Sequence, residues 1–523
     1  MKDLTTSIYN FEDLIQGNFL YVDKTEYIWQ LIRPAKGMYF LSRPRCFGKS
    51  LLVSTLKAIF EGRKELFNGL AIHAKPYDWT IHPVIHLDLG GRDFSTVEKM
   101  EERLKLILQE QADYNGVSLH DAALDTMFHE LIKTLHDRKG DVVILLDEYD
   151  KPILGNISRE DCSEFLASLK VFYSVIKEKA GMLRFALVTG VSKFCHVSLF
   201  SELNNLTDIT LTQDYAGMLG FTKEEVRKCF AEKITDAARL RGISEDELML
   251  GLLEWYDGYR FSKADIHVCN PVSITQFFAN NCEFDNYWGT TGVPTVLFEL
   301  AKTTRFNFEQ ALTAPVSSLA FGAYEVENID PLGLLWQTGY LTIKTVLPGP
   351  LGSSMFMLGF PDHEVEEAFN TQLLAYYSGY KDAAMSSMVF KLTSAIRQDD
   401  MELFMVTLQS YFASIPYGIR GGDEHYYQTI FFITFLLLGS SIEAESRTNE
   451  GRIDAYIRTA KTVFIFEFKL DRNTDEAVGQ ILDRHYYEKF QSCGLPIRLI
   501  GVNFDSSKGR IDGWQEGTLA SKK

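Results

Sequence analysis

The sequence has few cysteines, and they are not arranged in pairs. Seven cysteines are spread over 523 residues, at positions 46, 162, 195, 229, 269, 282 and 493. Because no C-x-x-C pair occurs, nothing in the spacing supports a zinc site or a disulfide framework. Scattered single cysteines are typical of a reducing compartment, so we expect a cytoplasmic protein.

Long apolar runs and an excess of basic charge are also lacking. The longest apolar run, TIFFITFLLLG at residues 429–439, is too short to span a bilayer and predicts a core helix instead. The N-terminus MKDLTTSIYNFEDLIQ has acidic residues and no apolar centre, unlike a signal peptide. The net charge of -17 argues against non-specific coating of nucleic acid. A local basic groove is still compatible with it, because net charge does not determine the distribution of charges.

One stretch with a chemical signature is YFLSRPRCFGKS, at residues 39–50. Its apolar start predicts a buried strand, RPRC a loop, and GKS the beginning of a helix. A helix start offers unpaired N–H groups and the positive end of the helix dipole, which favour phosphate. In the pattern G-x-x-x-x-G-K-[ST], Arg43 stands where the first glycine belongs, so an ordinary helix start is the alternative interpretation.

The match predicts a nucleotide site with Mg²⁺. Lys49 is expected to reach the β- and γ-phosphates, and the Ser50 hydroxyl to ligate Mg²⁺. The residues expected to contact ATP are Arg43, Pro44, Arg45, Gly48, Lys49, Ser50, Leu51 and Thr189.

A second motif, VVILLDEYD at residues 142–150, supports this site. Five apolar residues followed by Asp-Glu are typical of a buried parallel strand that ends in a magnesium site. Asp147 is expected to bind Mg²⁺ directly or through water, and Glu148 to orient or deprotonate the attacking water. Thr189 or Ser192 is expected to sense the γ-phosphate. A solvated strand end is the alternative interpretation of Asp147 and Glu148.

The order of elements predicts how these motifs meet. Strands alternate with helices over residues 38–190, which predicts a doubly wound parallel sheet. Ligands of such sheets bind beyond the carboxyl ends of the strands, where the loop and the Asp-Glu pair would both lie.

A further group of charged residues lies near the C-terminus. Residues 452–457 and 462–469 (RIDAYI and TVFIFEFK) predict two adjacent strands, the second of them buried. Glu467 and Lys469 are two residues apart and therefore point to the same face. Burying such a charged pair on an inward face costs free energy unless a metal ion or another partner neutralises the charges. Asp454 is expected to lie beside Glu467, and the two carboxylates with the Phe468 carbonyl would suit Mg²⁺.

This group is consistent with phosphodiester hydrolysis. A metal held by Asp454 and Glu467 would lower the pKa of a bound water and stabilise charge on the phosphodiester. Lys469 would orient that water or neutralise the pentavalent state. Glu424, on the preceding helix, would complete or support the site, and Gln480, on a helix over residues 474–490, would help to orient the nucleophile. The alternative is a salt bridge between Glu467 and Lys469 at a sheet edge.

The D…E-x-K arrangement resembles the PD-(D/E)XK nuclease superfamily. The whole chain resembles bacterial proteins that join an AAA-ATPase-like domain to a PD-(D/E)XK nuclease-like domain. The shared stretches are FLYVDKTEYI, LSRPRCFGKSLLVSTLKAIFEG, VVILLDEYDKPI, TGVSKFCHVSLFSELNNLTDIT, GFTKEE, WYDGYRF, CNPVSI, GRIDAYI, FIFEFKL and EAVGQILDRHYYEKF. In that family an arginine also replaces the first glycine of the loop, as Arg43 does here. Cys46 departs from the family, which has a second arginine after Arg45 at this position.

We therefore predict a bacterial α/β protein with three parts. These are a P-loop NTPase core with a parallel sheet at 15–220, a helical lid or winged-helix-like region at 221–362, and a restriction-endonuclease-like domain at 363–515. The resemblance implies ATP and Mg²⁺ as cofactors, with Mn²⁺ an alternative at the nuclease-like site. No membrane association is expected.

The expected function is ATP-gated, metal-dependent hydrolysis of DNA, with RNA a less favoured substrate. The alternative is a nucleotide-dependent regulatory switch whose C-terminal domain binds nucleic acid or a partner without cutting. Homo-oligomers are typical of many related ATPases, although no interface is recognisable in the sequence.

Overall fold

The chain folds into two compact units in the computed structural model. Unit 1 contains Met1–Gly292 and Ala314–Val365, and unit 2 contains Val293–Thr313 and Glu366–Lys523. The structure describes the backbone of residues 2–157, 159, 161–193, 205–289, 295–322, 329–379, 382–415, 424–438, 442–448 and 451–517. Within these ranges, no helix is both long and apolar enough to cross a membrane.

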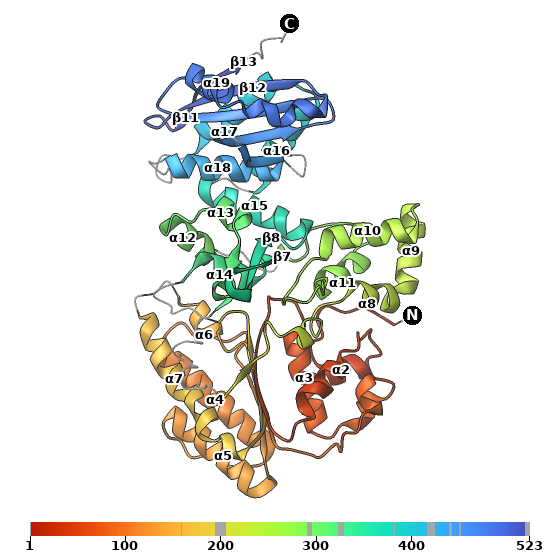
Figure 1. Cartoon of the computed structure of the whole chain (residues 1–523). Coiled ribbons are helices and arrows are strands. Elements are labelled where there is room, and N and C mark those ends of the chain that lie inside the picture. The colour runs from red at the N-terminus through yellow and green to blue at the C-terminus, as the bar shows by residue number, and fades with distance from the viewer. Residues whose placement is uncertain are drawn as a thin grey trace. The chain divides into compact units, whose positions relative to one another are not determined.

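Unit 1 is built on a five-stranded parallel sheet with the strand order β2-β3-β4-β1-β5. The strands are β1 (Gly37–Ser42), β2 (Val84–Asp88), β3 (Val142–Asp147), β4 (Leu183–Gly190) and β5 (Thr207–Asp208). Every residue of β3 is buried, as expected for a strand covered on both faces. Figure 1 shows α3 (Lys49–Phe60) on one side of the strands, and α5 (Leu124–Lys139) and α7 (Cys162–Glu178) on the other. The predicted doubly wound sheet is confirmed.

Further helices complete unit 1. Beside the sheet are α1 (Phe11–Gln16), α2 (Thr25–Ile32), α4 (Val97–Asn115) and α6 (Lys151–Leu154). A helical cluster follows, made of α8 (Lys223–Cys229), α9 (Ala231–Arg241), α10 (Glu245–Tyr256) and α11 (Pro271–Ala279). Capping boxes open α8 and α10, because Thr222 and Ser244 each exchange hydrogen bonds with a glutamate three residues later.

A small antiparallel sheet in the order β6-β8-β7 ends unit 1. It consists of β6 (Val316–Ser317), β7 (Thr342–Pro348) and β8 (Ser354–Gly359), and α14 (Pro331–Thr338) precedes β7. The expected helical middle region is therefore present.

Unit 2 is built on a mixed sheet with the strand order β13-β12-β11-β10-β9. Only β11 and β12 run parallel; the other neighbours are antiparallel. The strands are β9 (Ile442–Thr448), β10 (Gly451–Arg458), β11 (Val463–Leu470), β12 (Ile497–Asp505) and β13 (Arg510–Gly517). The helices are α12 (Thr295–Thr303), α13 (Phe308–Thr313), α15 (His363–Ser378, which begins in unit 1), α16 (Asp382–Arg397), α17 (Met401–Ser414), α18 (Glu424–Leu437) and α19 (Thr474–Asp483).

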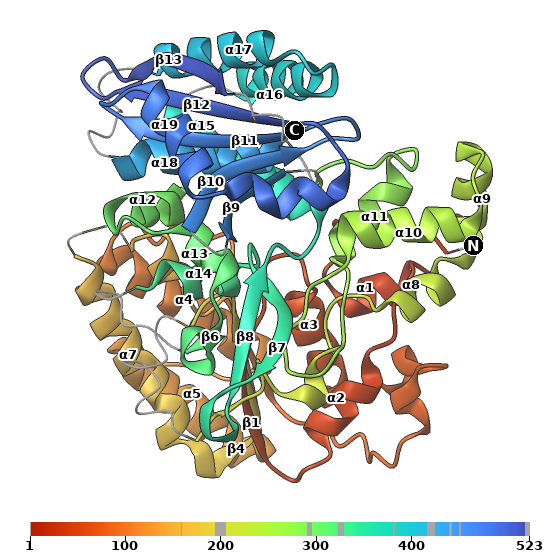
Figure 2. The ribbon, with the colours of Figure 1, turned by 45° about the horizontal axis from the view of Figure 1, so that its top comes forward.

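Helices cover both faces of this mixed sheet (Figure 2). On one face, Phe404 of α17 and Phe435 of α18 pack on Phe466 of β11. On the other, Ile481 of α19 packs with Ile465 of β11. The helix predicted over residues 474–490 is shorter than expected, because α19 ends at Asp483 and His485 adopts a left-handed conformation (φ 51°).

Candidate active sites

The phosphate loop joins β1 to α3 at the carboxyl end of the first sheet. Gly48 is the residue before α3 and has φ 91°, a left-handed conformation that glycine adopts without steric cost. Cys46 is also left-handed, with φ 67°. The loop thus turns sharply into the helix, and its last glycine is required by backbone conformation.

Lys49 is folded back onto its own loop. The side chain is buried, and its Nζ donates to the carbonyls of Arg43 and Pro44 at 2.9 Å each. Burial lowers the pKa of Lys49, and nearby acidic groups, chiefly Asp147, oppose that shift. Two carbonyl oxygens therefore accept hydrogen bonds from the ammonium group that the sequence analysis assigns to phosphate binding.

Three acidic residues lie at neighbouring strand ends beside Ser50. Asp147 is only 2% exposed; burial raises its pKa, while a hydrogen bond from Ser50 lowers it. Glu148 turns away from the strand with φ 52°, and burial raises its pKa as well. Asp88 ends β2 in register with Asp147, and its charge raises the pKa of both carboxyls. Our sequence analysis missed Asp88, although its place at the end of a buried strand was a usable signal.

The end of β4 supplies two further polar groups. Thr189 is fully buried beside Leu41 of β1, and its Oγ1 has no hydrogen-bond partner among the described residues. Ser192 is instead engaged by Asp150, whose Oδ2 accepts from the Ser192 amide and hydroxyl at 2.6 Å each. Asp150 thereby fixes the chain just after β4. The sequence analysis did not assign it a role, despite its place in the DEYD motif.

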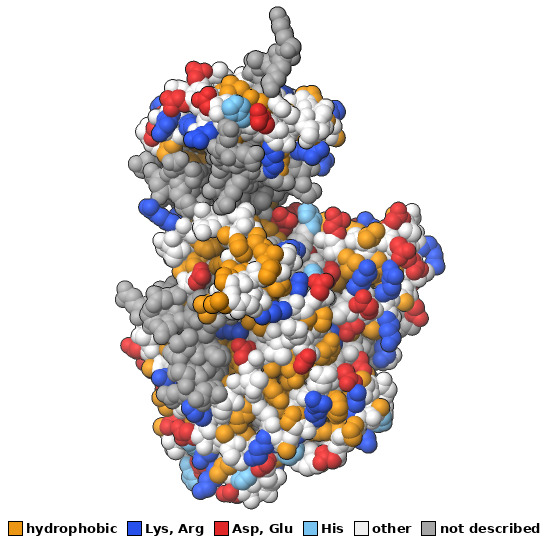
Figure 3. Space-filling model, viewed as in Figure 1, with side chains coloured by type: hydrophobic (Ala, Val, Ile, Leu, Met, Phe, Trp, Pro, Cys, Tyr) orange, Lys and Arg blue, Asp and Glu red, His pale blue; other side chains and the backbone are white. Residues whose placement is uncertain are grey.

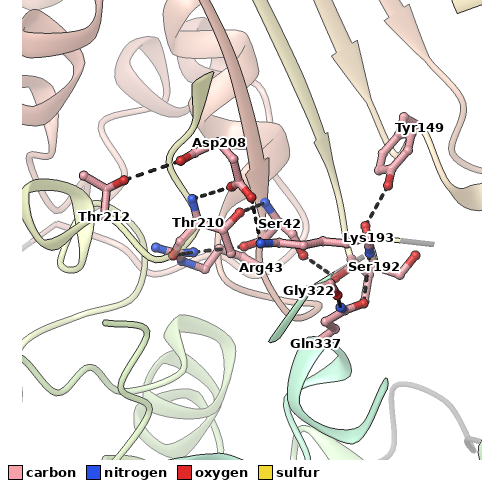
Figure 4. A network of polar contacts seen from close by, with 11 residues as sticks. Ser42, Arg43, Tyr149, Ser192, Lys193, Asp208, Thr210, Thr212, Gly322 and Gln337 are labelled. Carbon is pink, nitrogen blue, oxygen red and sulfur yellow. Dashed lines mark hydrogen bonds and ion pairs between the residues drawn. The ribbon is translucent and has the colours of Figure 1, made fainter. Parts of the chain in front are cut away.

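A polar network joins the strand ends to α14 (Figure 4). Lys193 is buried and pairs with Asp208 of β5 at 2.7 Å, while its amide donates to Oε1 of Gln337 at 2.9 Å. Gln337 lies in α14, and its Nε2 donates to the Gly322 carbonyl at 3.0 Å. The chain after β4 is therefore held from both the sheet and α14.

The two arginines of the loop are engaged by protein groups. Arg43 is 1% exposed, and its guanidinium donates to the carbonyls of Ser42 and Thr210 at 2.9 and 2.8 Å. Burial lowers the pKa of Arg43 to about 9, so it stays cationic at neutral pH. Arg45 is hydrogen-bonded to Tyr340. Arg43 would have to exchange these contacts to meet a phosphate, whereas Arg45 also lines the cavity at the loop.

A cavity of about 560 Å³ opens at the loop. At one end it is lined by Lys49, Ser50 and Glu148. Elsewhere it is largely apolar, and the lining there includes Leu4, Ile8, Leu20, Met218, Phe221 and Val272. A polar end that suits phosphates thus adjoins an apolar part that suits a flat ring system.

The second site is built on β11 in unit 2. Glu467 is 1% exposed and accepts a hydrogen bond from Lys469 Nζ at 2.9 Å. Lys469 Nζ also donates to Oε1 of Gln480 on α19 at 2.7 Å. The predicted placement of Glu467 and Lys469 on one face is confirmed, and Gln480 joins them there.

The other two carboxylates predicted for this site have side chains outside the described part of the structure. Glu424 begins α18, and Asp454 lies in β10. The residue after Asp454, Ala455, is the antiparallel partner of Phe466, the residue before Glu467. Continued by one residue, this register would set backbone position 454 opposite position 467.

Glycine lets α19 approach the sheet closely. Gly501 of β12 is in register with Glu467, and a Cβ there would lie 2.6 Å from the Thr474 carbonyl oxygen of α19. This close approach places Gln480 within reach of Lys469. Beside them is an open groove of about 380 Å³, whose lining is Lys469, Arg472, Glu476, Gly479, Gln480, Asp483 and Arg484.

Comparisons with known proteins match a different family in each of the two units. Residues 5–200 match the family described as "Predicted AAA-ATPase", and residues 422–514 match the PD-(D/E)XK nuclease superfamily. A protein of Azotobacter chroococcum mcd 1, described as an uncharacterized protein in the vnfD 5' region, is 35% identical over 526 residues, which is 98% of each chain.

Solved structures of low similarity include two proteins of Aeropyrum pernix. The ORC1 protein in complex with DNA is 12% identical, covers 66% of this chain and 91% of its own, and has a TM-score of 0.24. The ORC2 protein (ADPNP-ADP complexes) is 13% identical, covers 67% and 92%, and has a TM-score of 0.27. These scores carry no argument about function.

The parallel sheet with its GKS loop and the mixed sheet with its E-x-K strand define an ATPase-like protein with a nuclease-like C-terminal domain. The chain belongs to the family of AAA-ATPase-like proteins that carry a PD-(D/E)XK nuclease-superfamily domain.

Proposed function

We propose that unit 1 binds and hydrolyses ATP at the phosphate loop. The observation that carries this proposal is the convergence of Lys49, Ser50 and Glu148 on one cavity, with Asp147 hydrogen-bonded to Ser50. The Lys49 ammonium can exchange two carbonyl oxygens for phosphate oxygens. Ser50 and Asp147 offer the hard oxygen donors that Mg²⁺ prefers.

Each of these residues has a role in the proposed reaction. Ser50 and Asp147 would hold Mg²⁺, which supplies neutralisation of the phosphate charge when bound. Glu148 orients the attacking water, and the Thr189 hydroxyl donates to the γ-phosphate. The described residues contain no group of three or more His, Cys, Asp or Glu side chains placed to hold a metal. That is consistent with an ion held by one hydroxyl, one carboxylate and the nucleotide itself.

Calorimetric titration with ATP and Mg²⁺ tests this function. Lys49→Ala is expected to weaken ATP binding roughly 10- to 100-fold, because hydrogen bonds to charged groups contribute about 1.5–3 kcal/mol. Lys57→Ala, on the same helix and 3.9 Å from Glu61, is the matched control and should bind as wild type does. Equal affinity in wild type and Lys49→Ala would contradict the assignment.

For unit 2 we propose metal-dependent hydrolysis of DNA, gated by ATP. The carrying observation is the buried Glu467 joined through Lys469 to Gln480. Glu467 with Asp454 would hold the metal, Lys469 stabilises the negative charge that develops on the phosphodiester, and Gln480 positions Lys469. RNA is the less favoured substrate.

Cleavage of DNA with Mg²⁺ or Mn²⁺ tests the nuclease assignment. Lys469→Ala is expected to slow cleavage by roughly 10²–10³-fold, the usual effect of removing a group that stabilises developing charge. Lys461→Ala, at the exposed turn before β11, is the control. Gating further predicts that ATP stimulates cleavage by the wild type and not by Lys49→Ala. If Lys469→Ala cuts as fast as wild type, the nuclease function is wrong.

A second function is favoured by the charges around the groove. Glu476 and Asp483 line it together with Arg472 and Arg484. On the described part of the face in Figure 3, Lys and Arg side chains are interspersed with Asp and Glu. The alternative is therefore a nucleotide-dependent switch whose unit 2 binds nucleic acid or a protein without cutting. Cleavage that is lost in Glu467→Gln excludes this alternative.

A further inference from the structure

The phosphate loop packs against an aromatic segment that lies far away in the sequence. Phe47 has its ring centroid 4.7 Å from that of Tyr259 and 5.3 Å from that of Phe261, both in edge-on geometry. All three rings are buried. Tyr259 and Phe261 belong to the motif WYDGYRF at residues 255–261, which has no role in the ATP hydrolysis proposed above.

Arg43 strengthens the contact with the same segment. Its guanidinium lies 4.3 Å from the centroid of the Phe261 ring, a cation–π arrangement in a buried setting. Arg43 occupies the position where a glycine would begin the usual phosphate loop. The substitution thus places a large side chain between the loop and residues 255–261.

The end of α14 contacts the loop from a second direction. Gly339 has φ 90°, and a Cβ there would lie 2.6 Å from Pro44 Cβ and 3.4 Å from Tyr259 Cε1. The next residue, Tyr340, is hydrogen-bonded to Arg45. Pro44 and Arg45 of the loop therefore lie against Gly339 and Tyr340, the two residues that follow α14.

The two contacting segments are also joined to each other. The Arg260 amide donates to Thr342 Oγ1 at 2.7 Å, and this hydroxyl lies 3.2 Å from the Arg260 carbonyl oxygen, to which it donates. Residues 255–261 and 339–342 consequently form one support for the loop, which we call the loop clamp.

The clamp touches the part of the loop that Lys49 holds. Lys49 bonds the carbonyls of Arg43 and Pro44, and these two residues contact Phe261 and Gly339. A lysine that leaves the carbonyls for phosphate oxygens changes the loop where the clamp holds it.

We propose that the loop clamp sets the shape of the phosphate loop, so that nucleotide binding and the packing of residues 255–261 and 339–342 are coupled. The proposal rests on the proposed nucleotide-binding function of the loop. Because coupling is reciprocal, a weakened clamp lowers nucleotide affinity, and bound nucleotide tightens the clamp. Tyr259, Phe261 and Gly339 are positioning residues and do not touch the nucleotide.

Ring variants separate positioning from general stability. In the full-length chain, Tyr259→Leu is expected to weaken ATP binding about tenfold, because the edge-on ring contact with Phe47 is lost. Tyr259→Phe should retain wild-type affinity, since the Tyr259 hydroxyl has no hydrogen-bond partner among the residues described. Phe128→Leu removes a buried ring of α5 that stacks on Phe172 of α7, and is the control. It should lower the melting temperature without changing the Kd for ATP.

A pair of glycines gives a second, independent test. Gly339→Ala adds both left-handed strain and a methyl group against Pro44, and should weaken ATP binding at least tenfold. Gly242→Ala adds the same kind of strain, with φ 67° at the end of α9, but its methyl meets nothing within 4 Å. Gly242→Ala should therefore lower stability alone.

Amide hydrogen exchange reads the coupling directly. ATP is expected to slow exchange at residues 255–261 and 339–342 in the wild type and in Tyr259→Phe, and less so in Tyr259→Leu. Wild-type ATP affinity in Tyr259→Leu and Gly339→Ala, or unchanged exchange on ATP binding, overturns the clamp alone. Failure of the wild type to bind ATP overturns the nucleotide function, and the clamp with it.

Discussion

The two candidate sites hold their lysines in opposite ways. Lys49 bonds the carbonyls of its own loop, whereas Lys469 bonds the side chains of Glu467 and Gln480. The first lysine must give up a carbonyl before it can offer a phosphate more than one of its three N–H groups. The second already lies between a buried carboxylate and a helix packed on the sheet. In the proposed function, ligand binding therefore rearranges the site of unit 1, whereas packing assembles the site of unit 2 in advance.

The backbone explains this difference. The site of unit 1 is made of loops beyond the strand ends, with Cys46, Gly48 and Glu148 in left-handed conformations. The site of unit 2 lies within a strand, where side chains two residues apart share a face. Loops can change shape at low cost, but a central strand cannot. We expect variants that alter packing to affect the second site most.

The largest effect is predicted for Gly501→Ala. The added methyl would lie 2.6 Å from the Thr474 carbonyl oxygen and 2.8 Å from Val478 Cγ2, so α19 must move away from the sheet. We expect a loss of about 1–3 kcal/mol in the free energy of unfolding. DNA cleavage should fall by roughly 10²-fold, because Gln480 moves with α19.

Gly479→Ala is the matched control for the stability effect of this prediction. Gly479 lies in α19, and its added methyl meets nothing within 4 Å. The variant should raise stability by about 0.5–1 kcal/mol, because alanine favours helix. Urea unfolding and a cleavage assay measure both variants. Normal cleavage by Gly501→Ala would show that the second site does not depend on the position of α19.

A smaller effect is predicted for Gln480→Leu, which removes one acceptor from Lys469. The lost hydrogen bond has a charged donor, so cleavage should slow about tenfold or somewhat more. Gln480→Glu keeps an oxygen at the same place and should retain more activity than Gln480→Leu. If both variants cut at the wild-type rate, Gln480 has no part in positioning Lys469.

Short motifs made much of this comparison predictable from sequence. GKS after a strand, Asp-Glu at the end of VVILLDEYD, and Glu467 with Lys469 on one strand face all follow from contiguous residues and the period of a strand. The placement of Gln480 needed only a helix after β11. These features depend on local backbone geometry, which neighbouring residues determine.

Contacts between distant segments were not predictable. Asp88 meets Asp147 only through the register of β2 and β3. Arg43 was assigned to phosphate, yet its guanidinium lies on Phe261, more than 200 residues later in the sequence. A motif shows which residue types are present; the surrounding fold decides which of their groups remain available.

A third prediction concerns Thr189→Val in unit 1. The Thr189 hydroxyl is buried and has no hydrogen-bond partner within the described ranges, so its removal should leave the free energy of unfolding unchanged or raise it by about 1 kcal/mol. ATP hydrolysis should slow about three- to tenfold, because the proposed contact with the γ-phosphate is lost.

Thr55→Val is the contrasting control for stability. The Thr55 hydroxyl is also buried, but it donates to the Leu51 carbonyl at 2.7 Å. Its removal should lower the free energy of unfolding by about 1 kcal/mol. Thermal unfolding and a phosphate-release assay distinguish the two. Equal destabilisation by both variants would mean that Thr189 serves the fold and not the site.

The smallest effect is predicted for the charge of Asp88. Burial raises the pKa of Asp147 and of Glu148, and the Asp88 charge raises both further. Because the proposed reaction needs both carboxylates ionised, ATP hydrolysis should fall on acidification at a higher pH than ordinary carboxyls would require.

Asp88→Asn keeps an acceptor for the Gly90 amide, now at 2.8 Å, and removes the charge. The acid limb of the pH–rate profile should therefore move to lower pH, with little change at its plateau. Asp137→Asn, on the exposed side of α5, should leave the profile in place. An acid limb unmoved by Asp88→Asn would mean that the ionisation of neither Asp147 nor Glu148 limits the rate of ATP hydrolysis.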